Sequence, residues 1–131
     1  MLNIPVGTKR EQKLLVTSEV AVSFMGETAR VLGTPYLIAY LEMTSRNAVL
    51  DLLEPGEDTV GTRVDVRHLA ATPLGMQVTF RAEVIAVNER RVNFKVEAFD
   101  EKEKIAEGTH ERFVVNIARF ASRLQAKAAG Q

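Results

Sequence analysis

The sequence predicts an α+β domain in which an antiparallel sheet of about five strands wraps round one long central helix. An unbroken apolar run, Tyr36 to Leu41, begins a segment whose hydrophobic residues recur at helical spacing. Beyond Gly61 the hydrophobic period becomes two, and short polar turns separate the alternating segments. Short turns join antiparallel strands, and only one apolar helix is available to cover the buried face of the sheet. The helix is therefore expected at the centre of the sheet.

The composition fits a single globular domain over residues 1–131. The chain has 17 Lys and Arg, 17 Asp and Glu, and 46% hydrophobic residues, so nucleic acid and anionic membranes are disfavoured as partners. The absence of cysteine excludes disulfides, thiolate catalysis and sulfur-ligated metals. No apolar run approaches the roughly 20 residues that cross a bilayer, and the first residues lack an apolar core of signal-peptide length. We therefore expect a cytoplasmic protein.

The N-terminal third is expected to contain one strand. Residues 1–12 are interpreted as a lead-in loop, and alternation from Leu14 to Val22 predicts the first strand. The segment from Phe24 to Leu32 is short and mixed, which is typical of a small helix or a mobile flap.

The central helix is predicted over residues 35–53. Thr34 suits the capping position, a proline fits the first helical position, and a Pro-Gly pair follows the end. Two adjoining faces of this helix are apolar, which predicts burial over most of its circumference. One carboxylate, Glu42, lies inside the apolar element.

A turn over residues 54–61 is expected to lead into the rest of the sheet. Four strands are predicted over residues 63–68, 76–84, 92–98 and 105–115. Gly108, inside the last strand, indicates a bulge or a close backbone approach. The tail, residues 117–131, has apolar residues at helical spacing and a row of cations, Arg119, Arg123 and Lys127. We interpret this row as a solvated face, with a phosphate cradle as the less favoured alternative.

Glu42 and His68 are the candidates for proton-transfer chemistry. Glu42 could form an ion pair with Arg46, one helical turn on, or be a partly buried carboxylate that activates water or attacks an electrophile. Alternation places His68 on the inward face of its strand, at an end where a cleft could open. Convergence of the two side chains there would suit proton transfer near neutral pH, whereas the alternative is a core histidine bonded to a backbone carbonyl. Two histidines without cysteine predict no metal site.

Three further polar residues are weaker candidates. Thr34 is most simply a helix cap, although a helix N-terminus also offers N–H groups to an oxyanion. His110 and Arg112, in the sequence GTHER, are most simply polar residues of an edge strand that face solvent.

Three stretches resemble a known family. They are LLEPGEDTVGT at 52–62, VRHLAATPLG at 66–75 and GTHERFVVN at 108–116. Together with the acidic residue on the central helix, they resemble the fluoroacetyl-CoA thioesterase group of hot-dog thioesterases. The resemblance implies the hot-dog fold and a cofactor-free hydrolysis of an acyl-CoA thioester to free acid and CoA. It also implies a homodimer or higher homo-oligomer with sites at the interface.

The resemblance assigns roles to individual residues. It implies Thr34, Glu42 and His68 as catalytic residues, and Gly61, Arg112 and Phe24 as substrate-binding ones. Glu42 would act as general base or nucleophile. Phe24 belongs to segment 23–32, which matches the group little and is where a lid over the acyl pocket is expected. A short or medium acyl-CoA is therefore the expected substrate.

Two other functions remain open on the same fold. A non-catalytic acyl-CoA-binding module would pair Glu42 with Arg46 and leave His68 in the core. A hot-dog hydratase is less favoured, because the helix segment such enzymes use carries no closely spaced Asp and His here.

Overall fold

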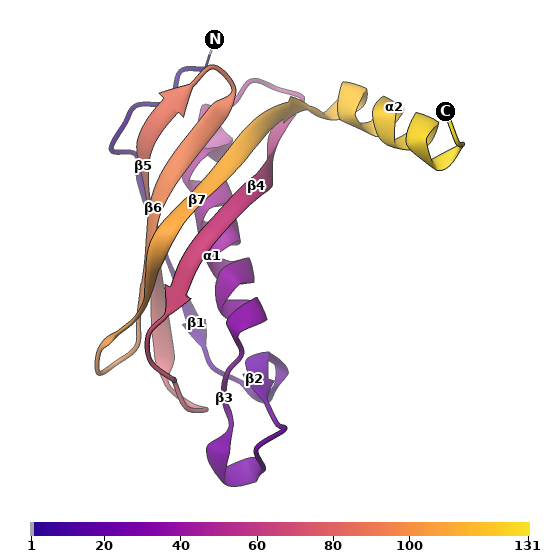
Figure 1. Ribbon diagram of the computed structural model, residues 1–131. Coiled ribbons are helices and arrows are strands. Elements are labelled where there is room, and N and C mark those ends of the chain that lie inside the picture. The colour runs from indigo at the N-terminus through magenta and orange to yellow at the C-terminus, as the bar shows by residue number, and fades with distance from the viewer. Residues whose placement is uncertain (1) are drawn as a thin grey trace.

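The computed structural model describes residues 2–131, which form a five-stranded antiparallel sheet wrapped round helix α1 (Figure 1). The sheet order is β1-β5-β6-β7-β4, and a separate two-stranded sheet pairs β2 with β3. The strands are β1 (Lys9–Leu15), β2 (Ala21–Val22), β3 (Val31–Leu32), β4 (Glu57–His68), β5 (Gln77–Asn88), β6 (Arg91–Phe99) and β7 (Lys104–Asn116). The helices are α1 (Thr34–Val49) and α2 (Ile117–Ala128). The predicted α+β architecture is confirmed.

The core lies between α1 and the concave face of the sheet. Alternate residues of β5 and β6 are buried against the helix, as the period of two predicts. On the helix side, Leu37, Leu41 and Val49 are buried at helical spacing. The rings of Tyr40 and Phe80 stack with centroids 5.6 Å apart, which joins helix and sheet directly. The helix ends at Val49 and is followed by a 3₁₀ turn over Leu50–Leu52, so the predicted end at residue 53 lies just beyond this turn.

The first strand and the turn before β4 differ from the prediction. Strand β1 has seven residues; it begins at Lys9, inside the predicted lead-in loop, and ends at Leu15. Because β1 is an exposed edge strand, its sequence KREQKLL is charged and shows no clear alternation. Residues Ser18–Val20 form a 3₁₀ turn instead of continuing the strand. Likewise β4 already begins at Glu57, within the segment predicted as a turn.

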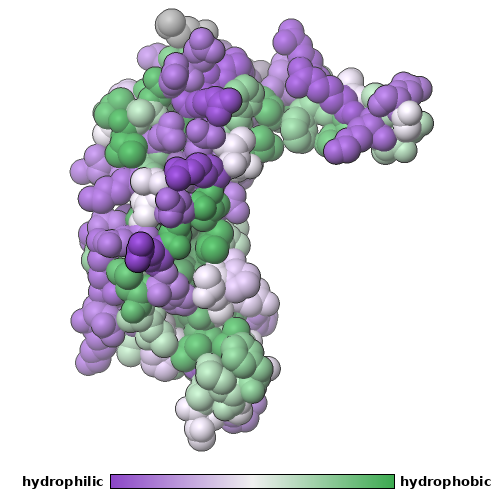
Figure 2. All heavy atoms as spheres, viewed as in Figure 1, coloured by the Kyte–Doolittle hydropathy of each residue, from purple (hydrophilic) through white to green (hydrophobic). Residues whose placement is uncertain are grey.

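Two parts of the molecule are poorly covered. Helix α2 leaves the end of β7 and extends away from the sheet (Figure 1), and none of its residues is buried. Strand β4 forms an edge of the sheet, and residues 61–65 within it are exposed. Figure 2 shows hydrophobic side chains along this edge beside α1 and over the flap, which we define as residues 23–30. Among residues 2–131, no helix is long and apolar enough to cross a bilayer. Location in the cytoplasm stays a prediction.

Candidate active site

Glu42 lies in a polar cluster between α1 and β7. The guanidinium of Arg112 donates from Nη1 to Glu42 Oε1 at 3.2 Å, and His110 Nε2 lies 3.7 Å from the same oxygen. The Glu42 side chain is 37% exposed, whereas those of His110 and Arg112 are 1% and 8% exposed. The carboxylate is thus held by buried groups and remains partly open to solvent.

Arg112 is fixed by strand β4. Its Nε donates to Thr59 Oγ1 at 2.7 Å and its Nη2 donates to the Thr59 carbonyl at 2.9 Å. Arg112 pairs with Gly61 in the β4–β7 ladder, so Thr59 lies two residues along the neighbouring strand. A planar guanidinium with these acceptors has little freedom to rotate, and Nη1 is therefore aimed at Glu42.

His110 acts as a fixed acceptor in the same cluster. Its Nδ1 lies 2.7 Å from the carbonyl oxygen of Arg63, which can only accept, so Nδ1 carries the proton. The free Nε2 then accepts from Arg112 Nη1 at 3.2 Å. Burial lowers the pKa of His110 below its ordinary value, which favours this neutral form. The expectation that His110 and Arg112 face solvent from an edge strand is wrong, because β7 lies between β6 and β4.

Gly61 makes room for the carboxylate. A Cβ on this residue would collide with Glu42 Oε1 and would lie 3.3 Å from His110 Cε1. A register shift between Gly61 and Arg63 marks a β-bulge at the same point of β4. The resemblance implied that the Gly61 backbone approaches substrate; in the structure it approaches Glu42.

Arg46 does not pair with Glu42. It donates to both carboxylate oxygens of Asp58, from Nε at 2.8 Å and from Nη2 at 2.6 Å. This bidentate hydrogen bond lowers the pKa of the Asp58 carboxyl. The interpretation of Glu42 as the partner of Arg46 is therefore wrong, and Glu42 is left to Arg112.

Thr34 and His68 form a second pair, at the start of α1. Thr34 Oγ1 and His68 Nδ1 lie 2.7 Å apart. The cap of the helix is Gly33, and Thr34 makes no capping hydrogen bond, so the capping role predicted for Thr34 is wrong. Within residues 2–131, the buried Nε2 of His68 has no hydrogen-bond partner. Burial also lowers the pKa of His68.

The pair faces a hollow of about 520 Å³ between the flap and the start of α1. Phe24, Met25, Thr34, His68 and Leu69 are among its lining residues. Phe24 is 81% exposed and Met25 is 52% exposed, although both are large apolar side chains. The structure thus brings Phe24, Thr34 and His68 to one space, which we call the flap hollow.

Glu42 does not belong to the flap hollow. It lies eight residues after Thr34, which is roughly 12 Å along the helix axis. The side chains nearest its carboxylate are those of Arg112 and His110, and His68 is bonded to Thr34. The expected convergence of Glu42 and His68 is therefore not found within one chain.

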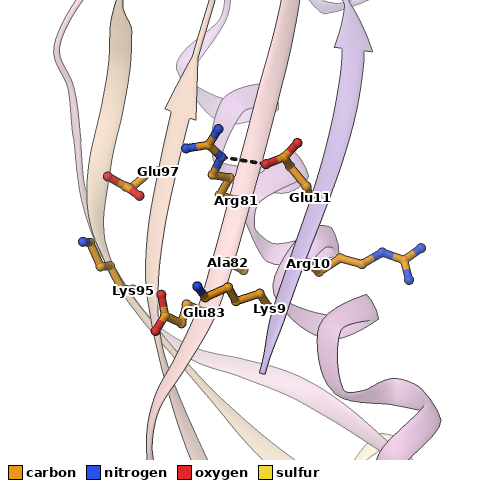
Figure 3. Close-up of a pocket in the computed structure, with 8 residues that line it drawn as sticks. All are labelled: Lys9, Arg10, Glu11, Arg81, Ala82, Glu83, Lys95 and Glu97. Atoms are coloured by element: carbon orange, nitrogen blue, oxygen red, sulfur yellow. Dashed lines mark hydrogen bonds and ion pairs between the residues drawn. The ribbon is translucent and has the colours of Figure 1, made fainter. Parts of the chain in front are cut away.

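A larger hollow, of about 630 Å³, lies at the β1 side of the sheet, away from both clusters (Figure 3). Its lining alternates cations and anions from β1, β5 and β6, with an ion pair between Arg81 and Glu11 at 2.7 Å. Such cross-strand charges are typical of a solvated sheet surface. Among the described residues, no group of three His, Asp or Glu side chains could hold a metal ion.

Sequence reasoning missed the place of His110 in the Glu42 cluster, and it missed two residues of β4: Thr59, which holds Arg112, and Asp58, which pairs with Arg46. The signal for His110 was present, because it shares the inward parity of its strand with Val114. Thr59 and Asp58 were assigned to a turn, which hid their place in β4.

The chain resembles known thioesterases in sequence and structure. The family model described as "Fluoroacetyl-CoA-specific thioesterase", FlK, matches residues 16–118. A fluoroacetyl-CoA thioesterase of Streptantibioticus cattleyicolor is 38% identical over 101 residues, covering 77% of this chain and 73% of the relative. A structure of the fluoroacetyl-CoA thioesterase FlK is 32% identical with a TM-score of 0.88, covering 95% of this chain and 98% of FlK. A variant of FlK was solved with fluoroacetate and CoA; it is 33% identical with a TM-score of 0.82, covering 89% and 99%.

A Thermus thermophilus thioesterase superfamily member has the same fold. It is 29% identical, with a TM-score of 0.88 over the full length of both chains. The hot-dog fold implied by the three sequence stretches is thus confirmed. The matched family model spans most of the chain, and this protein belongs to the fluoroacetyl-CoA-specific thioesterase (FlK) family.

Proposed function

We propose that this protein hydrolyses a short or medium acyl-CoA thioester to the free acid and CoA. The observation that carries the proposal is the Thr34–His68 pair beside the flap hollow, in which the buried Nε2 of His68 has no hydrogen-bond partner among the described residues. A buried polar atom without a partner is costly, and a bound thioester or water would satisfy it. Membership of the family and the CoA complex of a relative support the substrate class.

In the proposed reaction, a water oxygen adds to the thioester carbonyl carbon and the C–S bond then breaks. Glu42 takes the proton of the water as general base, or attacks the carbonyl itself and is released by water afterwards. The proton is finally delivered to the CoA thiolate, so free acid and free thiol result. Arg112 holds Glu42 in place during these steps, and His110 accepts a hydrogen bond from the same guanidinium.

The oxyanion is stabilised at the start of α1. Pro35 has no N–H, and the N–H groups of Tyr36 and Leu37 already donate to the Gly33 carbonyl. We therefore assign the backbone N–H of Thr34 as the donor to the oxyanion, supported by the positive end of the helix dipole. If the Thr34 hydroxyl donates to Nδ1, His68 carries its proton on Nε2 and can donate to the same oxygen.

Two observations disfavour the alternative of a non-catalytic acyl-CoA-binding module. It required Glu42 to pair with Arg46, but Arg46 pairs with Asp58. It also required His68 to be a satisfied core residue, but its Nε2 has no partner among the described residues.

We further propose a homodimer in which two β4 strands pair about a two-fold axis. Residues 61–65 of this edge are exposed, and Val64 and Met43 nearby are 40% and 45% exposed. An exposed strand edge of this kind is a template for pairing with another chain. Antiparallel pairing would place the Glu57 end of one β4 beside the His68 end of its partner's. Each site would then take Glu42 from one subunit and Thr34 and His68 from the other.

The reaction is tested by free-thiol release from a panel of acyl-CoAs. We expect Glu42→Gln, His68→Asn and Thr34→Val to lower kcat by about 10²-fold or more, while the exposed Glu19→Gln control retains the wild-type rate. Circular dichroism checks that each variant is folded. If the wild type releases thiol from none of the panel, the thioesterase proposal is wrong.

The shared site is tested by mixing. Glu42→Ala and His68→Ala chains, unfolded and refolded together, should recover about a quarter of the wild-type rate, because half of the dimers carry one intact site. Each variant refolded alone is the control. No recovery, with heterodimers shown by native mass spectrometry, would place Glu42 and His68 of one site in the same subunit.

A further inference from the structure

A third hollow, lined mainly by cations, lies where α2 leaves the sheet. It measures about 460 Å³, and its lining includes Arg90, Phe113, Arg119, Phe120 and Arg123. Glu57 is the one acidic residue in the described lining, and Arg90 already forms an ion pair with it. Arg119 and Arg123 therefore have no further acidic residue in this lining with which to pair. We call this space the basic hollow.

The charge of α2 stands out against the rest of the chain. Three of the 17 Lys and Arg, but none of the 17 Asp and Glu, lie in residues 117–131. Arg119 and Arg123 are one helical turn apart, so their guanidinium groups lie on one face, and both are exposed. The side chain of Asn116 caps the helix by accepting from the Arg119 N–H, which fixes the direction in which α2 starts.

We propose that the basic hollow binds the phosphates of the CoA nucleotide; this rests on the acyl-CoA thioesterase function and the dimer proposed above. Guanidinium groups bind phosphate oxygens in bidentate fashion. The half-buried rings of Phe113 and Phe120 offer apolar faces on which an adenine can stack. A phosphorylated adenosine diphosphate presents both kinds of group, which matches the composition of the lining.

The length of CoA decides which thioester site the hollow serves. The basic hollow lies at the Glu57 end of β4, and His68 of the same chain ends this 12-residue strand, about 36 Å away at roughly 3.3 Å per residue. The pantetheine arm has about 13 bonds between sulfur and the first phosphorus and spans roughly 16 Å when extended. The arm is therefore too short to reach within one chain. In the antiparallel dimer, the hollow lies beside the partner's flap hollow, within that reach.

Truncated substrates separate this role from catalysis. The double variant Arg119→Gln/Arg123→Gln should raise KM for the best acyl-CoA by roughly tenfold to a hundredfold and leave kcat unchanged. With the matching acyl-pantetheine, which lacks the nucleotide, the double variant and the wild type should have the same KM. Lys127→Gln is the matched control, because it removes the next cation of the same row outside the hollow lining. An unchanged KM for acyl-CoA, or an equal rise for both substrates, would overturn the proposal.

Direct binding gives an answer that does not depend on turnover. Adenosine 3′,5′-bisphosphate, titrated calorimetrically into the wild type, should bind with an affinity that falls as salt is raised, and the double variant should not bind it. If no thioester is hydrolysed but this ligand binds, the thioesterase proposal fails while the nucleotide site stands. If thioesters are hydrolysed and the ligand binds both proteins equally, the nucleotide site fails alone.

Sedimentation velocity checks that the double variant keeps the wild-type oligomeric state; a change in that state without a change in KM would identify α2 as a subunit contact instead.

Mixing tests the assignment to the partner's site. Arg119→Gln/Arg123→Gln chains refolded with His68→Ala chains should regain low-KM turnover, because one site of each heterodimer is complete. The same double variant refolded with Glu42→Ala chains should not regain it, because the hollow and Glu42 come from one subunit. The reverse pattern would contradict the assignment.

Discussion

Arg112 and Glu42 are 70 positions apart in the sequence, yet Nη1 of the arginine donates to Oε1 of the carboxylate at 3.2 Å. The arginine makes this contact from β7 while Thr59 of β4 holds the rest of its guanidinium. Helix α1, β4 and β7 therefore meet at one carboxylate. The orientation of Glu42 depends on all three elements, so substitutions in β4 and in β7 can each test it.

Replacing Arg112 with lysine tests the guanidinium fork. An ammonium group cannot donate to Thr59 and Glu42 together, so kcat for acyl-CoA hydrolysis should fall roughly tenfold to a hundredfold with the fold retained. The control is Arg91→Lys, which alters an exposed ion pair to Glu111. Equal rates for both variants would show that the fork does not orient Glu42.

Gly61→Ala and Gly108→Ala should fail in different ways. The new Cβ at Gly61 meets the end of the Glu42 side chain, which can move, so we expect a folded protein with reduced kcat. The Cβ at Gly108 meets the backbone of Asp65 and Val66, which cannot move without breaking the β4–β7 ladder. Gly108→Ala should therefore lower the melting temperature strongly. Thermal unfolding and thiol release on both variants check this; a Gly61→Ala variant with a strongly lowered melting temperature and normal kcat would be the opposite result.

Stability should fall on the acid side because of the two histidines. Burial lowers the pKa of both His68 and His110 in the folded protein below the ordinary value of 6.5. Below about pH 6.5 the unfolded chain binds protons that the folded chain does not, so the free energy of unfolding decreases as pH is lowered. Urea unfolding between pH 8 and pH 5 measures this slope. The carboxyl pKa of Glu57 and Asp58 is also lowered, but these groups act at still lower pH.

A His68→Asn/His110→Asn double variant is the control for this slope. It should be less stable near neutral pH but should show little pH dependence between pH 6.5 and pH 5. A double variant with the wild-type slope would assign the effect to other groups.

Phe24→Ala tests the flap as a substrate contact. Phe24 lines the flap hollow while 81% exposed, so its removal should cost little stability but should raise KM for acyl-CoA by roughly three- to tenfold. Ile85→Ala removes another exposed apolar side chain, on β5, and should leave KM unchanged. If KM responds equally to both, Phe24 has no specific role.

The central strands and the helix α1 were predictable because burial of a face sets the spacing of their hydrophobic residues. Val92, Phe94 and Val96 alternate because one face of β6 is buried, and the burial is complete in the structure. Only the last two residues of β1 were predicted as strand, because the segment from Lys9 to Lys13 is charged or polar and has no hydrophobic alternation.

The candidate site was predictable in its members but not in its contacts. Glu42 stood out as a carboxylate in an apolar helix, and His68 by its parity. The partner of each depended on contacts far apart in the chain: Arg112 for Glu42, and Thr34 for His68. Helical spacing favoured Arg46 for Glu42, but spacing cannot show that Asp58 of β4 offers Arg46 two oxygens.

The two ion pairs around α1 are nested in the sequence, because the pair Arg46–Asp58 lies between the two members of the pair Glu42–Arg112. Glu42 and Arg46, one turn apart on the helix, are bound to Arg112 and Asp58 on two different strands. Sliding the helix by one turn in one direction would bring Glu42 toward Asp58, and sliding it by one turn in the other direction would bring Arg46 toward Arg112, so either shift opposes like charges. The two ion pairs therefore fix the register of the helix against the sheet, which hydrophobic contacts alone specify weakly.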